Sequence, residues 1–262
     1  MSQVVNGLWI GTLSKMQILS MRSFLKSGHR YKLWVYDRNI KNVPKGVEIC
    51  NANLIIDKRH IFRHWSGNLA TFADIFRYKL LYEKGGWWVD LDLISLKHLP
   101  KVDYFFGGER TKQSGAFKNK SKHTFWIGLM KFPKGDPILK TMYEDMMSKK
   151  QDFQNPSKNL RFNYGQTQLK KLLQEKYGDD FVYTHNKYDV DLFNPLSYFD
   201  MIDFFKQGDI KKCCNRWGWS EMDVDKMINR SYTIHLFNKI IKELQEKRKM
   251  KCKLIEKLDK MI

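Results

Sequence analysis

The stretch over residues 67–93 constrains the fold of this 262-residue chain more than any other segment. Apolar residues recur at intervals of three and four up to Lys84, so they share one face of a predicted helix. Gly85-Gly86 predicts the end of that helix, because glycine adopts the left-handed conformation of a helix C-cap without steric cost. The segment over residues 87–93, which is apolar except for two aspartates near its end, then predicts a strand. The apolar helix positions are Leu69, Phe72, Ala73, Phe76, Leu80 and Leu81.

The N-terminal residues predict a β–α–β unit, from which parallel sheets are built. A strand over residues 4–10 precedes a helix that Ser14 caps and Gly28 ends, and a second strand covers residues 31–36. Further strands are expected at 104–106 and 232–236, and further helices at 137–149 and 166–177. With neither a repeat nor a flexible linker, we expect one α/β domain over residues 1–238, followed by a tail over residues 239–262.

The composition supports a sizeable core and predicts anionic partners. Hydrophobic residues make up 42% of the chain, which excludes a disordered protein. The net charge of +19 is typical of proteins that meet nucleic acid, an acidic membrane surface or phosphorylated substrates. No apolar run is long enough to span a membrane, and the N-terminus does not resemble a signal peptide. The four cysteines lack the spacing of a zinc site, so we expect a cytoplasmic protein.

Four charged residues in the central stretch are candidates for chemistry. Asp74 and Arg77 lie three apart on one side of the predicted helix, where a plain surface ion pair is the alternative interpretation. Asp90 and Asp92 lie two apart at the end of the predicted strand, so their side chains are expected on one face, roughly 6.6 Å apart. At the carboxyl end of a strand, this pair predicts a site for a hard divalent cation, with a solvated strand end as the alternative.

The same residues resemble a known family. The pattern Asn68-Leu-Ala-Thr-Phe-Ala-Asp74-Ile-Phe-Arg77-Tyr-x-x-Leu-Tyr82-x-x-Gly85-Gly86-Trp-Trp88-x-Asp90-x-Asp92 resembles the DXD-motif glycosyltransferases. That group includes yeast initiating mannosyltransferases, bacterial capsule and lipopolysaccharide sugar transferases, and glucosylating clostridial toxins. This chain departs from the family pattern at Trp88, where tyrosine is commoner. The segments Gly7-Leu8-Trp9-Ile10-Gly11 and Ile234-His235-Leu236-Phe237-Asn238 resemble the family's opening strand and closing segment, although residues 95–230 match it only weakly.

The resemblance implies a fold, an activity and a set of site residues. It implies a GT-A-like (Rossmann-like) α/β domain with a mixed central sheet that transfers a sugar, with retention of configuration, to a glycan or another hydroxyl acceptor. The expected cofactors are Mn²⁺ or Mg²⁺ and a nucleotide sugar, which we take to be a UDP-hexose. The implied catalytic residues are Asp74, Arg77, Asp90 and Asp92, and the implied metal ligands are Asp90, Asp92 and His235. The implied nucleotide-sugar contacts are Trp9, Ile10, Asp74, Arg77, Trp88, Asp90 and His235.

Two other functions fit parts of the sequence. A non-enzymatic nucleic-acid-binding protein would explain the charge and the many aromatic residues, but it gives the Asp90/Asp92 pair no use. Glycoside hydrolysis uses two carboxylates on opposite sides of the scissile bond, and neighbours on one strand do not flank a bond. Taken singly, Trp9 and His235 are typical of a protein core, and only the central motif favours a role in a site.

The tail over residues 239–262 differs in character from the rest of the chain. As a helix it gathers apolar residues on roughly one side and basic residues on the other, which favours an anionic membrane interface. The alternative is a helix that packs on its own domain or on a partner subunit. The basic residues are Lys239, Lys242, Lys247, Arg248, Lys249, Lys251, Lys253, Lys257 and Lys260.

Overall fold

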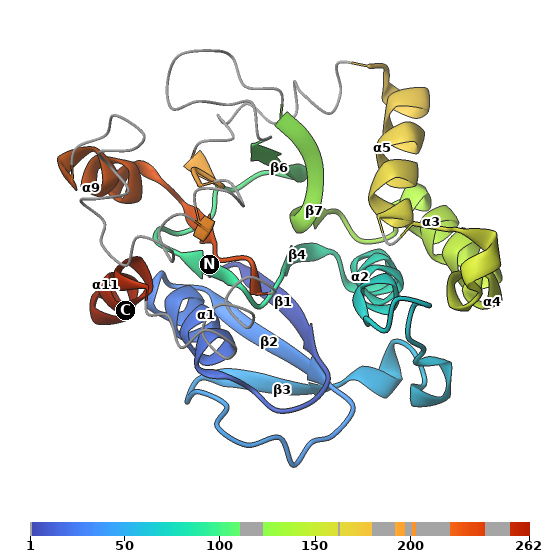
Figure 1. Ribbon diagram of the computed structural model, residues 1–262, viewed down its shortest axis with the longest axis horizontal. Coiled ribbons are helices and arrows are strands. Elements are labelled where there is room, and N and C mark those ends of the chain that lie inside the picture. Colours follow the sequence, from blue (N-terminus) through green and yellow to red (C-terminus); the bar gives the residue numbers. More distant parts are fainter. Residues whose placement is uncertain are drawn as a thin grey trace.

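The computed structural model describes residues 2–110, 123–161, 163–179, 192–196, 201–202, 221–238 and 252–262. A six-stranded sheet runs through the middle of the protein in the order β3-β2-β1-β4-β7-β6 (Figure 1). The first four strands in this order are parallel, whereas β7 is antiparallel to β4 and β6 is antiparallel to β7. This arrangement confirms the expected α/β fold with a mixed central sheet. The strands are β1 Val4–Trp9, β2 Arg30–Val35, β3 Val47–Asn51, β4 Gly86–Val89, β6 Phe105–Arg110 and β7 His123–Phe132.

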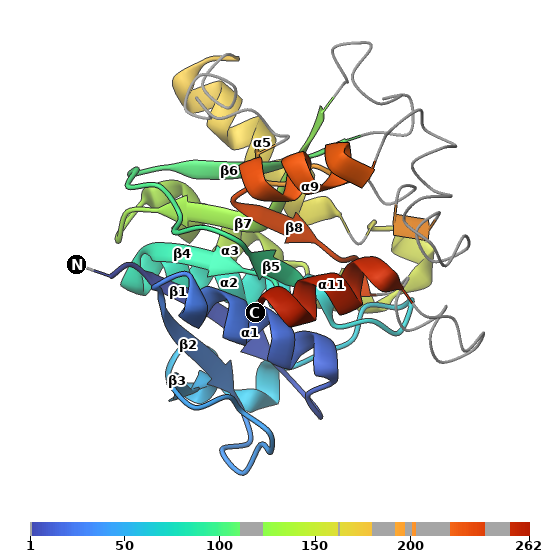
Figure 2. The same cartoon turned by 90° about the vertical axis from the view of Figure 1, so that its left-hand side faces the viewer.

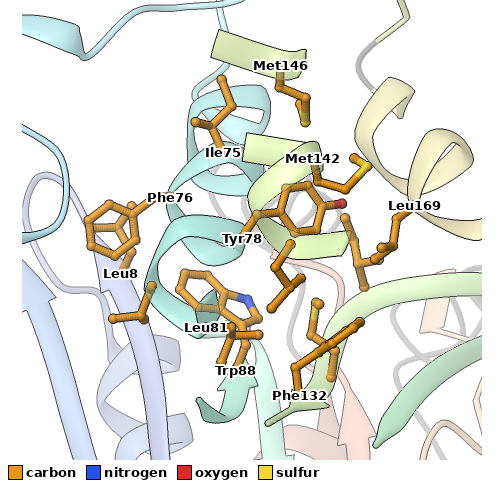
Figure 3. Packing of buried hydrophobic residues seen from close by; sticks show 14 of the residues in the cluster. Leu8, Ile75, Phe76, Tyr78, Leu81, Trp88, Phe132, Met142, Met146 and Leu169 are labelled. Carbon is orange, nitrogen blue, oxygen red and sulfur yellow. The ribbon is translucent and has the colours of Figure 1, made fainter. Parts of the chain in front are cut away.

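Helices cover both faces of the sheet. Helix α1 (Lys15–Lys26) packs on one face, and helices α2 (Ala70–Lys84), α3 (Pro137–Ser148) and α5 (Tyr164–Tyr177) pack on the other (Figure 1). The core between α2, α3, α5 and the sheet is rich in aromatic residues and methionine, including Phe76, Trp88 and Met142 (Figure 3). The remaining helical pieces are η1 Ala52–Leu54, η2 Lys58–His60, α4 Lys150–Gln154, η3 Pro156–Lys158 and α9 Glu221–Arg230.

Helix α1 begins where the sequence predicts. The Ser14 hydroxyl accepts a hydrogen bond from the backbone of Met16, and the Gln17 side chain accepts one from the backbone N–H of Ser14, which makes a capping box. This cap fixes the turn between β1 and α1. It therefore also fixes where the first turn of α1 lies relative to the carboxyl end of β1.

The junction between α2 and β4 follows the prediction, but the strand after it is shorter than expected. Gly85 ends the helix with a φ of 66°, a conformation that favours glycine. The expected strand over residues 87–93 is wrong in its second half, because β4 ends at Val89. The backbone N–H of Asp90 donates a hydrogen bond to the carbonyl of Gly128 in β7. The backbone N–H of Leu93 donates to the carbonyl of Asp90, so residues 90–92 form a turn. Asp90 and Asp92 consequently do not share the face of one strand.

Strands β3 and β7 were not expected from the sequence. Strand β7 is a continuous apolar run at its centre rather than an alternating one, because helices and sheet residues cover both of its faces. The other predicted elements occur with ends shifted by one to three residues or, for β6, extended to Arg110.

A second, two-stranded sheet joins distant parts of the chain. Strand β5 (Leu93–Ser95) pairs with β8 (Thr233–His235), and Leu93 lies opposite His235 in this pairing. The backbone N–H of Leu236 also donates to the carbonyl of Asp92. The central motif and the closing segment are therefore held side by side, as the resemblance implies.

Within the tail, helix α11 (Lys253–Met261) packs on the domain. Leu254 and Leu258 are buried in one cluster with Met16 and Leu19 of α1, and both views place α11 beside α1 (Figures 1 and 2). The apolar side of this helix is therefore covered by its own domain, as the alternative interpretation of the tail expects, whereas residues 239–251 lie outside the described residues. Among the described helices, none has the length and apolar character that crossing a bilayer requires.

Candidate active site

A pocket of about 550 Å³ opens at the carboxyl ends of β1 and β4. From β1 the sheet order runs through β2 to β3 in one direction and through β4 in the other, so the pocket lies where the order of strands reverses. Open α/β sheets bind ligands at such a point. We call it the aspartate pocket; its lining includes Trp9, Ile10, Gln17, Arg63, Asn68, Arg77, Trp88, Asp90, Asp92 and Asn238.

Asp90 is held by two residues of the central motif. Its Oδ1 accepts hydrogen bonds from Arg77 Nη2 at 3.0 Å and from Trp88 Nε1 at 2.8 Å. Arg77 also lies 3.1 Å from Asp74 and donates from Nη1 to the carbonyl of Ile127. The guanidinium stacks 4.9 Å from the centre of the Trp88 ring. Arg77 and Asp74 therefore brace Asp90 from inside the protein, and the surface ion pair considered for them is wrong, because both side chains are at least 90% buried.

Burial dominates the electrostatics of this group. It raises the pKa of Asp74 to about 7, with Arg77 opposing the shift and Asp90 adding to it. Burial likewise raises the pKa of Asp90, against the opposing effect of Arg77. Burial alone would lower the pKa of Arg77, but Asp90 and Asp74 hold it above its usual value. The pocket wall thus contains one permanent positive charge shared by two carboxylates that resist ionisation.

Asp92 has a different environment, although only Leu91 separates it from Asp90. Its Oδ2 lies 3.2 Å from His235 Nε2 and accepts a hydrogen bond of 2.9 Å from the backbone N–H of Asn238. Burial opposes ionisation of Asp92, but His235 and the Asn238 amide outweigh it, and the pKa of Asp92 lies below its usual range. Asp92 is therefore the carboxylate of the pair that is ionised most readily.

Aromatic rings and a strained backbone fix the position of His235. Its ring stacks on Trp126 with centroids 4.6 Å apart and contacts Phe237 at 3.9 Å. Phe237 has a φ of 56°, which is uncommon for a residue other than glycine and costs free energy. That turn directs the backbone N–H of Asn238 to Asp92. Strain of this kind is found at sites whose geometry the surrounding fold over-determines.

Gly128 in β7 allows the sheet to approach Asp90 closely. A Cβ atom at this position would lie 2.7 Å from Asp90 Oδ2 and closer still to the ring of Trp126. No other residue type fits without moving these groups. The importance of Gly128 could not be predicted from the sequence, because it depends on a contact between strands.

The predicted site residues lie together, but in two layers. Trp9, Ile10, Arg77, Trp88, Asp90 and Asp92 line the pocket. Asp74 and His235 lie behind this lining, where each contacts a residue that belongs to it. Trp9 is partly exposed and donates from its indole nitrogen to the carbonyl of Thr12, which orients its ring at the end of β1. Trp88 is buried, and it acts on the pocket by holding Asp90.

Oxygen atoms of the pocket are suited to a hard divalent cation. In the described part of the chain, no three His, Cys, Asp or Glu side chains converge as a metal centre requires. The amide oxygen of Asn238, however, is buried and has no hydrogen-bond partner among the described residues. Asn238 lines the pocket next to the readily ionised Asp92. Carboxylate and amide oxygens are the ligands that such cations prefer, so the residues present fit a metal ion.

Sequence reasoning missed two polar residues of the lining, Gln17 and Asn238, as binding residues. Asn238 belongs to the closing segment that resembles the family, but only His235 was assigned a role there. Gln17 appeared only as part of a predicted helix. Each carries a buried polar atom without a partner in the described part of the protein, a property that becomes visible only in three dimensions.

A family model described as "Glycosyltransferase sugar-binding region containing DXD motif" matches residues 14–109. These residues include Asp74, Arg77 and the Asp90-x-Asp92 motif of the pocket. The chain carries a DXD-motif glycosyltransferase region. The resemblance read from the sequence is thereby confirmed, and with it the GT-A-like α/β fold class.

Solved glycosyltransferase structures are similar to this chain at low sequence identity. "PaToxG Glycosyltransferase" is 16% identical, with a TM-score of 0.47, over 88% of this chain and 85% of its own. The apo-form glycosyltransferase GlyE of Streptococcus pneumoniae TIGR4 is 14% identical, with a TM-score of 0.44, over 90% of this chain. The match covers 55% of GlyE, so this chain spans about half of its length. No curated protein sequence matches the chain.

Proposed function

We propose that this glycosyltransferase moves a hexose from a UDP-linked donor to a hydroxyl group of a glycan or another acceptor, with a divalent metal ion and with retention of configuration. The observation that carries the proposal is the pair of carboxylates on the wall of the aspartate pocket, one braced by Arg77 and one by His235. The two carboxylates have opposite pKa shifts, which suits two different tasks in one site.

The side chains divide the binding of the sugar nucleotide between them. Trp9 offers a partly exposed aromatic ring on which a base can stack. Asp90, fixed by Arg77 and Trp88, offers its second carboxylate oxygen to hydroxyl groups of the donor. Arg77 and Asp74 act as positioning residues, because the guanidinium is already bound to Asp74, Asp90 and the Ile127 carbonyl.

Asp92 and the Asn238 amide oxygen, together with Asp90, would hold the metal ion. A divalent cation bound there supplies positive charge for the diphosphate leaving group. His235 keeps Asp92 ionised and oriented through its Nε2, and the backbone N–H of Asn238 fixes the same oxygen. That His235 is itself a ligand stays a prediction, since its Nε2 faces Asp92.

Donor turnover and metal binding test this proposal separately. Release of UDP from UDP-hexoses should require Mn²⁺ or Mg²⁺ and stop after treatment with EDTA. The electron paramagnetic resonance signal of free Mn²⁺ decreases as the ion binds and therefore measures the affinity. This affinity should be weaker in Asp92→Asn and in Asn238→Ala than in the wild type. UDP release at an unchanged rate in EDTA would contradict the metal role. Failure of every nucleotide sugar to bind or turn over would contradict the proposed activity.

A further inference from the structure

Gln17 lies in the first turn of α1 and also lines the aspartate pocket. Its side chain is fully buried. Its Oε1 accepts hydrogen bonds from the backbone N–H of Ser14 at 3.0 Å and from the Ser14 hydroxyl at 2.5 Å. Gln17 is therefore both the third residue of a capping box and part of the pocket wall.

The capping box determines which way the Gln17 amide points. A backbone N–H can only donate, so the atom that faces Ser14 N has to be the oxygen. The Nε2 group is consequently turned away from the cap. Within the described residues, this nitrogen is buried and has no acceptor. A buried amide donor without an acceptor costs free energy, and native proteins rarely leave one unless water or a ligand completes it.

The choice of glutamine is informative in its own right. The third position of a capping box is filled by glutamate as well as by glutamine, because the cap needs only a side-chain oxygen. Glutamate would also interact favourably with the N-terminus of α1, whose first turn contains no acidic residue. Glutamine differs from glutamate at this buried position in carrying no charge and in its Nε2 donor, and the cap does not use that donor.

We propose that Gln17 donates a hydrogen bond from Nε2 to an oxygen of the nucleotide part of the sugar donor. This inference rests on the proposed function, because it assigns a binding role within the same pocket. The acceptor is an oxygen of the base, the ribose or the phosphates. A negatively charged or carbonyl oxygen at this place also benefits from the partial positive charge at the N-terminus of α1. Gln17 thereby favours ligands that present an acceptor there and disfavours those that present a donor.

Two substitutions of Gln17 separate the hydrogen bond from the cap. Gln17→Glu keeps an oxygen for Ser14 and removes the Nε2 donor, but it also buries a carboxylate, so this variant should be less stable to urea than the wild type. Gln17→Met removes the donor without adding charge, and it also weakens the cap. Ser14→Ala is the matched control, because it weakens the cap and leaves the Gln17 amide in place.

Isothermal titration with UDP in the presence of Mn²⁺ measures the outcome. We expect Gln17→Glu and Gln17→Met to bind UDP about ten- to a hundredfold more weakly, which corresponds to the loss of one buried hydrogen bond. Ser14→Ala should bind within about twofold of the wild type. The inference is wrong if Gln17→Met binds UDP as tightly as Ser14→Ala does. This holds even if Gln17→Glu binds UDP more weakly, because the added charge alone would explain that loss.

Uridine and pyrophosphate, used as separate ligands, locate the acceptor. A weaker affinity of Gln17→Met for uridine places the acceptor on the base or ribose, and a weaker affinity for pyrophosphate places it on the phosphates. Either result supports the inference. If the wild-type protein binds none of these ligands, the proposed function itself fails. Binding by the wild type with unchanged affinity in Gln17→Met refutes only the role of Gln17.

Discussion

Two pockets lie at opposite ends of strand β1, and they differ in the hydrogen bonding of the amide side chains that line them. The aspartate pocket lies at the carboxyl end, whereas a second pocket of about 440 Å³ lies at the amino end. We call the second one the lysine pocket, because its lining includes Lys32, Lys84 and Lys131 together with the amides of Gln3 and Asn6.

Both amides of the lysine pocket have hydrogen-bond partners within the protein at the nitrogen and at the oxygen. Asn6 donates to the carbonyl of Trp87 and accepts from Trp34 Nε1. Gln3 donates to the carbonyls of Leu99 and Pro100 and accepts from Trp87 Nε1 and Lys131. In the aspartate pocket the Asn68 amide is also paired at both ends, whereas one polar atom of the amide is buried and unpaired in Gln17 and in Asn238, as far as the structure describes the chain. Paired amides stabilise the fold, whereas unpaired amides beside two carboxylates indicate a ligand site.

The largest expected effect is on catalysis at the aspartate pocket. Asp92→Asn should lower the rate of sugar transfer by about 10³-fold, because it removes the most readily ionised carboxylate from the site. Lys131→Gln, a matched removal of one charge from the lysine pocket, should leave the rate unchanged. Steady-state UDP release from both variants measures the difference. Equal losses in the two variants would show that the pockets do not differ in function.

The next largest effect is the loss of stability that we expect when Arg77 is replaced. Arg77→Ala leaves the buried Asp74 and Asp90 without their positive partner, so it should lower the free energy of unfolding by about 3–5 kcal/mol. Removing Lys32, whose ion pair with Glu48 is partly exposed, should cost at most about 1 kcal/mol. Urea unfolding at pH 8 tests this, and a loss below 1 kcal/mol for Arg77→Ala would argue against a buried network.

The pH dependence of stability should reveal Asp74. Its pKa is about 7 in the folded protein and about 3.9 in the unfolded chain, so the folded state binds the proton more tightly. The contribution to stability is present below pH 4 and is lost as the pH rises to 7, with a slope of at most about 1.4 kcal/mol per pH unit. Asp74→Asn should remove this part of the slope. If the free energy of unfolding in urea has the same slope against pH from 4 to 7 in Asp74→Asn as in the wild type, the raised pKa of Asp74 is refuted.

The same substitution, asparagine to alanine, can be made in both pockets, at Asn6 in the lysine pocket and at Asn238 in the aspartate pocket. Asn6→Ala leaves the indole nitrogen of Trp34 unpaired in the core and should lower stability by about 1–3 kcal/mol without changing affinity for UDP. Asn238→Ala should do the reverse, weakening metal-dependent binding while stability stays within about 0.5 kcal/mol. Thermal unfolding with and without UDP and Mn²⁺ distinguishes them. The interpretation of unpaired amides fails if both variants lose only stability.

The smallest expected effect concerns the cap of α1. Ser14→Ala should lower stability by about 1 kcal/mol, since it removes the side-chain acceptor for the backbone of Met16. Urea unfolding measures this loss. A loss above 3 kcal/mol would mean that Ser14 holds more than the cap, and it would disqualify this variant as the control for Gln17.

Much of the fold could be predicted because local signals were strong. The Ser14 cap, the helix ending at Lys84 and the Gly85 C-cap each depend on a few neighbouring residues, and all occur as expected. The strand over residues 87–93 was predicted too long. Apolar residues recur beyond Val89 at Leu91 and Leu93, but the backbone of Asp90 turns to meet Gly128, a residue 38 positions away.

The residues of the site could be predicted better than their arrangement. The motif placed Asp90, Asp92 and Arg77 in one site, and the structure brings them to one pocket. That Arg77 faces inward, or that Gln17 and Asn238 carry unpaired atoms, depends on burial and on contacts between distant strands. Neither the spacing of residues nor the family motif contains that information.

Titration of UDP with and without metal tests the central claim most directly. We predict that the wild-type protein binds UDP in Mn²⁺, that EDTA weakens this binding by about tenfold or more, and that Asp92→Asn binds UDP equally weakly in both conditions. Asn6→Ala should retain the full response to Mn²⁺. An affinity for UDP that is the same in Mn²⁺ and in EDTA, or a full response to Mn²⁺ in Asp92→Asn, would contradict a metal-dependent nucleotide site in the aspartate pocket.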